Sequence, residues 1–118
     1  MHEPSQRLTV IVAARNEAES LPVLHPRIAA VLRRLDGIDA RVLYVDDGSS
    51  DTTWQVMQGL ARQDASVSLL RLSRNFGKEL ALTAGLDQVE EGAVLILDAD
   101  GQDPPELIPQ FVSKWREG

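Results

Sequence analysis

Four short apolar runs divide this sequence, and each is followed by a segment whose apolar residues recur at helical spacing. The runs are rich in Val, Ile and Leu and lie at residues 7–14, 40–45, 67–72 and 93–98. They are continuous rather than alternating, as in strands that are covered on both faces. Strands that alternate with helices predict an α/β fold with a parallel sheet, right-handed crossovers and helices on both faces. A chain of 118 residues suffices for one core, so we expect residues 1–118 to form a single domain.

The segments after the runs predict four amphipathic helices. Their apolar stripes are Leu21, Leu24, Ile28, Val31 or Leu32, and Leu35; Trp54, Met57, Leu60 and Ala61; Leu80, Thr83, Ala84 and Asp87, continuing from Phe76; and Leu107, Ile108, Phe111, Val112 and Trp115. Pro26 lies too deep for a helix that begins at Ser20, because only the first turn tolerates a missing N–H group. We therefore expect the first helix to start late or to kink at Pro26.

The composition excludes several classes of protein. A net charge of −6 disfavours a nucleic-acid surface, which needs clustered Lys and Arg. The chain has no cysteine, which excludes disulfides and thiolate sites, and it has neither a G-x-G-x-x-G nor a P-loop motif. Its apolar runs are too short to span a bilayer and its first residues lack the apolar core of a signal peptide, which predicts a soluble chain. We interpret His2 and His25 as surface residues.

Polar segments follow all four predicted strands. They read ARNE at 14–17, DDGSSDTT at 46–53, SRNFGKE at 73–79 and DADGQDPPE at 98–106. Open parallel sheets bind ligands beyond the carboxyl ends of their strands, where the strand order reverses. In the strand order 3-2-1-4, the first and fourth strands are neighbours at this point, so Glu17, Asp46 and the segment 98–102 converge on one crevice.

An acidic pair at the end of the fourth run favours a metal site. Asp98 and Asp100 are one residue apart after an apolar strand, so both carboxylates can face one hard cation. Oxygen ligands select Mg²⁺ or Mn²⁺, and the amide of Gln102 is a further candidate ligand. The alternative is that these acids simply end a strand and solvate a turn.

The next acidic residues fit the start of a helix. Asp103 matches an N-cap, Pro104 the first helical position, and Glu106 the carboxylate of a capping box. We therefore expect Asp103 and Glu106 to be structural rather than functional.

The polar segments after the second and third strands mix structural and binding residues. Asp51 is expected to cap the second helix. Asp46 and Asp47 have no such structural duty, and their carboxylates can accept hydrogen bonds from the N–H groups of a nucleotide base. Arg74 and Lys78 either reach a phosphate or extend from the start of the third helix, and the two interpretations are equal.

Four motifs, taken in this order and spacing, closely resemble those of family 2 glycosyltransferases with the GT-A fold. They are VIVAARNEAESLP, VLYVDDGSSDTT, LSRNFGKELALTAGLD and VLILDADGQDPPELI. The resemblance runs from about Leu8 to Trp115 and covers the N-terminal, donor-binding half of the family's Rossmann-like domain. The forms RNFGKE and DADGQDPPE look most like the branch that loads a sugar onto a polyprenyl phosphate, which includes dolichyl-phosphate mannosyltransferase and bacterial undecaprenyl-phosphate glycosyltransferases.

The resemblance implies a nucleotide pocket at the ends of the first two strands. Ala13, Arg15 and Glu17 fall where the family lines this pocket, and Asp46 falls where a carboxylate contacts the base. Two positions depart from the family's pattern, because Ala13 replaces a common proline and Arg15 replaces a common aromatic residue.

The resemblance also implies how a metal is held. Asp98, Ala99 and Asp100 match the family's DxD element, which binds the diphosphate of the sugar donor through Mg²⁺ or Mn²⁺. Gln102 matches a further metal ligand of the polyprenyl-phosphate branch, and Gly101 replaces a common leucine.

The activity implied by the resemblance is an inverting displacement that moves a sugar from a UDP- or GDP-linked donor to a polyprenyl phosphate, with the metal neutralising charge on the departing diphosphate. The acceptor half would lie beyond Gly118, so we expect this chain to bind donor and metal but to be inactive alone. The resemblance places a full-length enzyme at the cytoplasmic face of the membrane, the fragment itself in the cytoplasm, and leaves room for a homo-oligomer.

Two other classes share a parallel sheet and an acidic metal pocket. In a phosphoacceptor receiver domain, however, the acidic pair follows the first strand and the acceptor Asp follows the third, whereas the acidic pairs here follow the second and fourth. A nucleotidyltransferase usually has a glycine-rich, basic loop after the first strand, and AARNEAES is neither.

Overall fold

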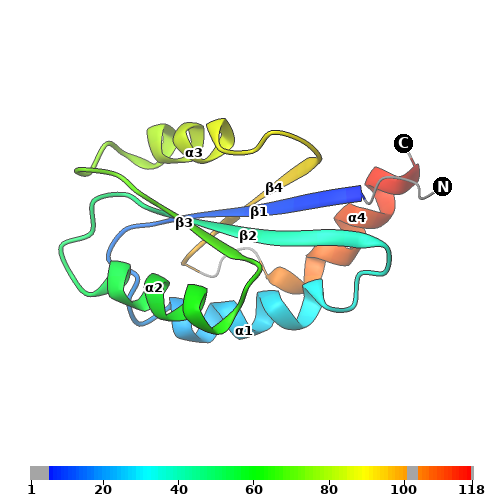
Figure 1. The fold of residues 1–118 in the computed structure, drawn as a ribbon, viewed down its shortest axis with the longest axis horizontal. Coiled ribbons are helices and arrows are strands. Elements are labelled where there is room, and N and C mark those ends of the chain that lie inside the picture. The colour runs from blue at the N-terminus through cyan, green and yellow to red at the C-terminus, as the bar shows by residue number, and fades with distance from the viewer. Residues whose placement is uncertain (1–5, 101–103, 118) are drawn as a thin grey trace.

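The computed structural model describes residues 6–100 and 104–117, in which strands and helices alternate as predicted (Figure 1). The elements are β1 (Gln6–Ala14), α1 (Leu21–Leu32), β2 (Ile38–Asp46), α2 (Thr53–Gln63), β3 (Val67–Arg71), α3 (Lys78–Asp87), β4 (Ala93–Asp98), the short 3₁₀ helix η1 (Pro105–Leu107) and α4 (Ile108–Glu117). Within these two ranges, the structure contains no helix that is both long and apolar enough to cross a membrane.

The four strands form one parallel sheet with the predicted order β3-β2-β1-β4. Figure 1 shows α3 on one face of this sheet and α1, α2 and α4 on the other. The register places Ala13 of β1 opposite Asp98 of β4 and Ala14 of β1 opposite Asp46 of β2. The ends of the three strands that carry the predicted site residues therefore lie next to one another.

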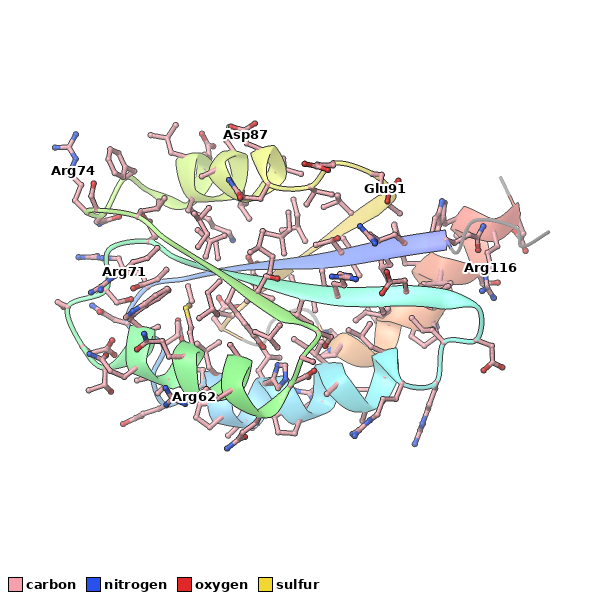
Figure 2. The ribbon with its side chains drawn as sticks, in the orientation of Figure 1. Arg62, Arg71, Arg74, Asp87, Glu91 and Arg116 are labelled. Carbon is pink, nitrogen blue, oxygen red and sulfur yellow. The ribbon has the colours of Figure 1, made fainter. Side chains whose placement is uncertain are left out.

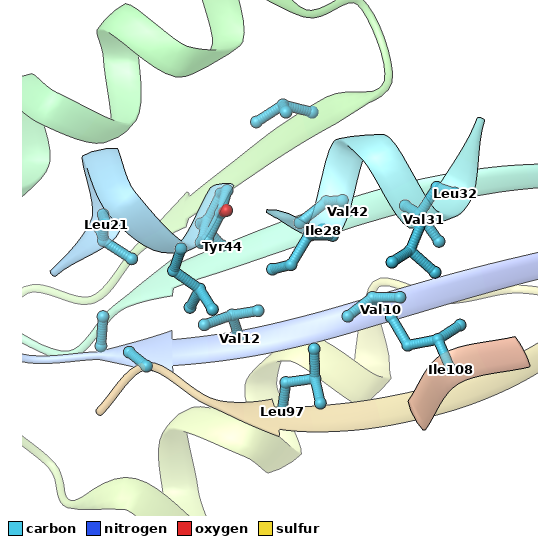
Figure 3. Packing of buried hydrophobic residues seen from close by; sticks show 14 of the residues in the cluster. Val10, Val12, Leu21, Ile28, Val31, Leu32, Val42, Tyr44, Leu97 and Ile108 are labelled. Carbon is cyan, nitrogen blue, oxygen red and sulfur yellow. The ribbon is translucent and has the colours of Figure 1, made fainter. Parts of the chain in front are cut away.

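A separate apolar core on each face holds the helices to the sheet. In the larger core, Val10 and Val12 of β1 lie among Ile28 and Val31 of α1 and Ile108 of α4 (Figure 3). The smaller core lies under α3 and consists of Ile11, Leu43, Val45 and Ala81. Most of β1 and the second half of β2 are thus buried on both faces, which explains why their runs do not alternate, whereas the edge strands β3 and β4 are only partly buried.

The stripe predicted for α3 is wrong. Ala81 and Gly85 face the sheet, whereas Leu80 is 57% exposed. A Cβ atom added to Gly85 would lie 3.1 Å from methyl groups of both Ile11 and Val45. The helix therefore packs so close to the sheet that only small residues fit beneath it, and the larger Leu80 points outward.

Of the two alternatives expected for α1, the late start is wrong, and a kink at Pro26 stays a prediction. The helix begins at Leu21, directly after Ser20, and Pro26 lies inside it. The turn before it is already closed, because the N–H groups of Ser20 and Leu21 both donate to the carbonyl oxygen of Glu17 at 3.1 Å.

The helical start near the C-terminal end of the sequence falls one residue later than predicted. Pro104 has an extended conformation, with φ −68° and ψ 130°, and Pro105 is the first residue of η1. The reason is steric, because a residue that precedes proline is disfavoured in the helical region. Asp103, the predicted N-cap, lies outside the described residues. Glu106 accepts two hydrogen bonds from Arg27 of α1, which ties η1 to the larger layer of helices.

His25 is buried, contrary to the prediction of a surface residue. Its Nδ1 lies 2.7 Å from the hydroxyl oxygen of Tyr44, and its Nε2 lies 2.9 Å from Oδ2 of Asp64. Burial, with a smaller contribution from the Asp64 charge, raises the pKa of Tyr44. The carboxylate of Asp64 only accepts hydrogen bonds, which places a proton on Nε2 of His25, and in the neutral ring Nδ1 then accepts from the hydroxyl of Tyr44. Nε2–H then donates to Asp64, and the three side chains connect α1, β2 and the turn after α2.

Candidate functional site

The polar segments gather at the carboxyl ends of the strands. The side chains of Arg71 and Arg74 lie at this end of the molecule, and those of Glu91 and Arg116 lie at the other (Figure 2). Arg71 is the register partner of Asp46, which in turn is the partner of Ala14. The structure thus brings the predicted residues of β1, β2 and β4 to one edge of the sheet, as the strand order requires.

Asn16 joins the loop after β1 to the loop after β2. Its Oδ1 accepts hydrogen bonds from the backbone N–H groups of Ser50 at 2.8 Å and Asp51 at 3.3 Å, and its own N–H donates to Oγ of Ser49 at 2.9 Å. Asn16 has φ 56°, a left-handed conformation that asparagine tolerates better than most residues. Asn16 was not among the predicted site residues, although its position between two of them, Arg15 and Glu17, was a usable signal.

The residues expected to line a nucleotide pocket from β1 lie on either side of Asn16. Ala13 is half-buried beside Asp98, Arg15 is exposed, and Glu17 is half-buried. The backbone N–H of Glu17 donates to Oγ1 of Thr53 at 2.9 Å, which fixes this loop against the start of α2. The side chain of Arg15 therefore reaches solvent from a loop whose backbone is held in place.

Asp46 is fully buried at the end of β2. Its Oδ1 accepts a hydrogen bond from the backbone N–H of Ser49 at 3.1 Å. Its Oδ2 receives no hydrogen bond from any residue that the structure describes, and lies 3.8 Å from Nε of Arg71. Asp46 thus keeps an unused acceptor, as a base-binding carboxylate requires, but the oxygen does not open to solvent.

The prediction that Asp47 has no structural duty is wrong. Its two carboxylate oxygens accept the backbone N–H groups of Phe76 at 2.8 Å and Gly77 at 3.1 Å. Asp47 therefore holds the loop after β3 against the loop after β2. The same contact leaves room only for glycine at position 48, because a Cβ atom there would lie 2.2 Å from the backbone of Arg74. The φ of Gly48 is +65°, which also favours glycine.

Asp51 has the structural role that was predicted for it. Its Oδ1 accepts the backbone N–H and the hydroxyl of Thr53, in the first turn of α2, although the residue assigned as the cap is Thr52. The hydrogen bond from the Thr53 side chain lowers the pKa of Asp51.

The acidic pair at the end of β4 is more open. The carboxylate of Asp98 is 25% exposed and forms an ion pair with Lys78, at the start of α3, whose side chain is 58% exposed. Ala99 is buried and Asp100 is exposed, whereas Gln102 lies outside the described residues. The ammonium group of Lys78 therefore compensates the charge of an acidic residue of the candidate metal site.

The candidate metal-binding carboxylates fit a metal ion that also binds the phosphates of a ligand. Within residues 6–100 and 104–117, no three His, Cys, Asp or Glu side chains are grouped so that they could enclose a metal ion. Mg²⁺ is commonly bound by one or two carboxylates together with the phosphates of a substrate. Asp98 and Asp100 match that smaller donor set.

Two hollows border these strand ends. One, of about 390 Å³, is lined by Gly48, Ser49, Arg71, Leu72, Ser73 and Arg74. The other, of about 270 Å³, is lined by Ser20, Val23, Leu24, Arg27, Ala99 and Asp100. A larger hollow, of about 650 Å³, includes His25 and Asp64 but lies near the amino ends of β2 and β3, away from the acidic pairs.

Comparison with known protein families identifies the family of this chain. The model of glycosyl transferase family 2 matches residues 9–118. The chain belongs to glycosyltransferase family 2. This membership confirms the resemblance seen in the motifs and decides against a receiver domain and a nucleotidyltransferase.

Curated relatives carry more specific names. The chain is 42% identical over 111 residues to an uncharacterized glycosyltransferase of Synechocystis sp., covering 94% of this chain and 35% of that protein. It is 38% identical to the bactoprenol glucosyl transferase of Shigella phage SfV, with coverages of 95% and 36%. It is 40% identical to the undecaprenyl-phosphate 4-deoxy-4-formamido-L-arabinose transferase of Serratia proteamaculans, with coverages of 98% and 36%. The chain thus spans about a third of the length of these relatives.

Solved structures of other proteins share the fold. A mannosyltransferase of Pyrobaculum calidifontis, in complex with GDP-Man and Mn²⁺, matches with a TM-score of 0.64 and 28% identity over 80% of this chain and 27% of that one. TarS of S. aureus matches with a TM-score of 0.72 and 23% identity over 95% of this chain and 33% of that one. The latter likeness concerns the fold alone.

Proposed function

We propose that residues 1–118 form the donor-binding domain of a longer glycosyltransferase that moves a sugar from a nucleotide diphosphate to a polyprenyl phosphate. The observation that carries this proposal is the meeting of Asp98, Ala13 and Asp46 at adjacent strand ends in a family 2 chain. The nucleotide is supported by the mannosyltransferase solved with GDP-Man, and the lipid acceptor by the names of the bactoprenol and undecaprenyl-phosphate relatives.

The donor would lie along the edge of the sheet. Asp46, at the end of β2, accepts an N–H group of the base, while Asp98 and Asp100, after β4, hold Mg²⁺ or Mn²⁺ against the diphosphate. A bound divalent cation supplies charge neutralisation for the departing diphosphate. Lys78 pairs with Asp98, so its ammonium group stands where it can turn from that carboxylate to a phosphate oxygen.

The transfer is proposed to be a direct, inverting displacement. The phosphate of a polyprenyl acceptor is largely anionic at neutral pH, since its second pKa is about 6, so it needs no general base to become a nucleophile. The work of this chain is then to position the donor and to hold its diphosphate while charge develops there. A full-length enzyme with a lipid acceptor would act at the cytoplasmic face of a membrane.

Titration calorimetry tests the proposal. UDP, GDP and CMP are titrated into the chain with and without Mn²⁺, and the experiment is repeated with Asp98→Asn. We expect UDP or GDP to bind in a Mn²⁺-dependent manner, and Asp98→Asn to weaken that binding at least tenfold. The matched control is Asp87→Asn, which changes an exposed acidic residue of α3 and should leave the affinity unchanged. A chain that binds no nucleotide diphosphate in the presence of Mn²⁺ would refute the proposal.

A further inference from the structure

Asn16 has an unusual backbone conformation in a loop at the surface. Among the residues that the structure describes, it is the only one other than glycine with a positive φ, at 56°. A side chain makes this conformation costly, whereas glycine adopts it freely. Residues held in such conformations cluster at functional sites, where the surrounding contacts keep them in place. The side chain of Asn16 therefore provides something that glycine would not.

The side chain provides a bridge between two loops. Its Oδ1 accepts the backbone N–H groups of Ser50 and Asp51 and, at 3.3 Å, the hydroxyl of Ser50, while the backbone N–H of Asn16 donates to Oγ of Ser49. The loop after β2 is itself anchored, because the N–H of Ser49 donates to the buried carboxylate of Asp46. The hydrogen bonds of Asn16 thus connect the loop after β1 to a fixed point of the sheet.

The fold does not depend on this bridge. Asn16, Ser50 and Asp51 are exposed, so water can replace their hydrogen bonds, and such an exchange changes stability little. The ends of β1 and β2 are already joined by their register and by the N–H of Asp47, which donates to the carbonyl oxygen of Ala14 at 3.0 Å. A strained residue that adds little stability at the ligand-binding edge of a sheet indicates a role in the site.

The bridge fixes the residues on both sides of Asn16. Arg15 and Glu17 are the two predicted pocket residues that flank it, and the N–H of Glu17 donates to the side chain of Thr53 at the start of α2. The loop after β1 is therefore bonded to the segment after β2 at two points. Asp98 is held by a different contact, since its ion-pair partner belongs to α3. Loss of the Asn16 side chain should thus disturb the two loops and leave Asp98 in place.

We propose that Asn16 is a positioning residue for the nucleoside part of the donor. This inference rests on the proposed function, in which the loops after β1 and β2 line the nucleotide pocket while Asp98 and Asp100 hold the diphosphate through a metal. Asn16 does not contact the donor in this assignment. It keeps the backbone of Arg15 and Glu17 in the binding conformation before the donor arrives, and a loop that is ordered in advance costs less free energy on binding than one that the ligand must order.

Two substitutions separate the hydrogen bonds from the backbone conformation. Asn16→Gly keeps the positive φ accessible and removes the acceptor, whereas Asn16→Asp keeps an acceptor of the same size and tolerates the same conformation. Amide hydrogen exchange at Ser50 and Asp51 reports the bridge itself, and we expect faster exchange in Asn16→Gly than in the wild-type chain or Asn16→Asp.

Titration calorimetry in the presence of Mn²⁺ then compares UDP and GDP with inorganic pyrophosphate, which lacks the nucleoside. We expect Asn16→Gly to weaken the nucleotide that the wild-type chain prefers about fivefold or more and to change pyrophosphate by less than about twofold. Asn16→Asp is the matched control. It should keep the wild-type ratio of the two affinities, because repulsion between its charge and the phosphates acts on both ligands.

Each outcome decides the inference. An unchanged ratio of nucleotide to pyrophosphate affinity in Asn16→Gly would overturn it, whether both ligands bind more weakly or neither does. Equal losses of nucleotide affinity in Asn16→Gly and Asn16→Asp would overturn it as well, because the acceptor would then have no part in binding. Thermal melting shows that the variants are folded, and the exposed position of Asn16 predicts melting temperatures close to that of the wild-type chain. If the wild-type chain binds neither UDP nor GDP with Mn²⁺, the proposed function itself fails, and this inference fails with it.

Discussion

The acidic stretches after β2 and β4 look alike in the sequence but are used differently in the fold. Asp46 and Asp47 are buried, and Asp47 gives both of its oxygens to backbone N–H groups of the next loop. Asp98 and Asp100 are accessible, and the partner of Asp98 is the exposed side chain of Lys78. Carboxylates at one edge of a sheet thus divide into those that hold loops together and those that stay accessible.

The largest effect is expected at the contact between the loops after β2 and β3. Gly48→Ala forces a left-handed residue to carry a Cβ atom 2.2 Å from the backbone of Arg74. We expect the free energy of unfolding to fall by about 3 kcal/mol, from steric overlap and backbone strain together. Urea denaturation measures this loss of unfolding free energy.

Gly59→Ala is the matched control for this substitution. Apart from its chain neighbours and the backbone of its own helix, no atom of the described residues lies within 4 Å of a Cβ at Gly59, which is in the interior of α2. Alanine should raise the free energy of unfolding there by up to about 1 kcal/mol, since it is the better helix former. Equal stability of the two variants would contradict the close contact at Gly48.

The next effect tests the structural role of Asp47. Asp47→Ala leaves the N–H groups of Phe76 and Gly77 without their acceptor, and we expect a loss of about 2 kcal/mol of unfolding free energy. Asp47→Asn keeps one acceptor oxygen and should lose less. If Asp47→Ala has the same urea midpoint as the wild-type chain, Asp47 does not stabilise the loop after β3, and the acidic stretch after β2 has no structural role.

A smaller effect concerns pH. The hydrogen bond from Thr53 lowers the pKa of Asp51, so Asp51 stabilises the fold above its unfolded pKa of about 4, and this contribution is lost as the pH falls through the lower folded pKa. Asp51→Asn should therefore be less stable than wild type at pH 7, and the difference should shrink below pH 4. Urea midpoints between pH 2.5 and pH 7 measure it. A difference that stays constant across this range would show that the charge of Asp51 has no part in it.

The smallest effect on stability is expected at the open stretch. Lys78→Ala removes an ion pair whose lysine side chain is more than half exposed, and such pairs contribute little, so the free energy of unfolding should change by less than about 0.5 kcal/mol. The affinity for a nucleotide diphosphate should nevertheless fall. A loss of stability as large as that of Asp47→Ala would remove the distinction between the two stretches.

Periodicity was sufficient to predict the architecture. Continuous apolar runs and their alternation with helical segments predicted the parallel sheet, and the doubly wound order 3-2-1-4 that was assumed for it is the order observed, β3-β2-β1-β4. The stripe of α3 was missed because Leu80 follows the apolar period, while the close approach of the helix over Ile11 selects Ala81 and Gly85. The distance between a helix and the sheet depends on the tertiary structure, and the spacing of apolar residues in the sequence does not reveal it.

Polar residues were harder to predict than apolar ones, because their partners are distant in the sequence. The partners of His25 are Tyr44 and Asp64, which are 19 and 39 residues away, so an isolated histidine in the sequence is a buried one in the fold. Asp47 was interpreted as a binding residue for the same reason, since its partner Phe76 lies 29 residues further on. Sequence motifs predicted which residues meet at one edge of the sheet, but they did not separate the acids that hold loops from those that stay exposed.

The most direct test of the different roles of the two acidic stretches is to locate the Mn²⁺ site. In NMR spectra of the chain with a nucleotide diphosphate, paramagnetic Mn²⁺ broadens the amide signals of the residues nearest to it. We predict that the signals of residues 98–100 broaden first, while those of Glu90 and Glu91, an acidic pair at the opposite end of β4, persist at the same Mn²⁺ concentration. Broadening that begins at Glu90 and Glu91, or that spares residues 98–100, would contradict the assignment of the β4 stretch as the metal and donor site.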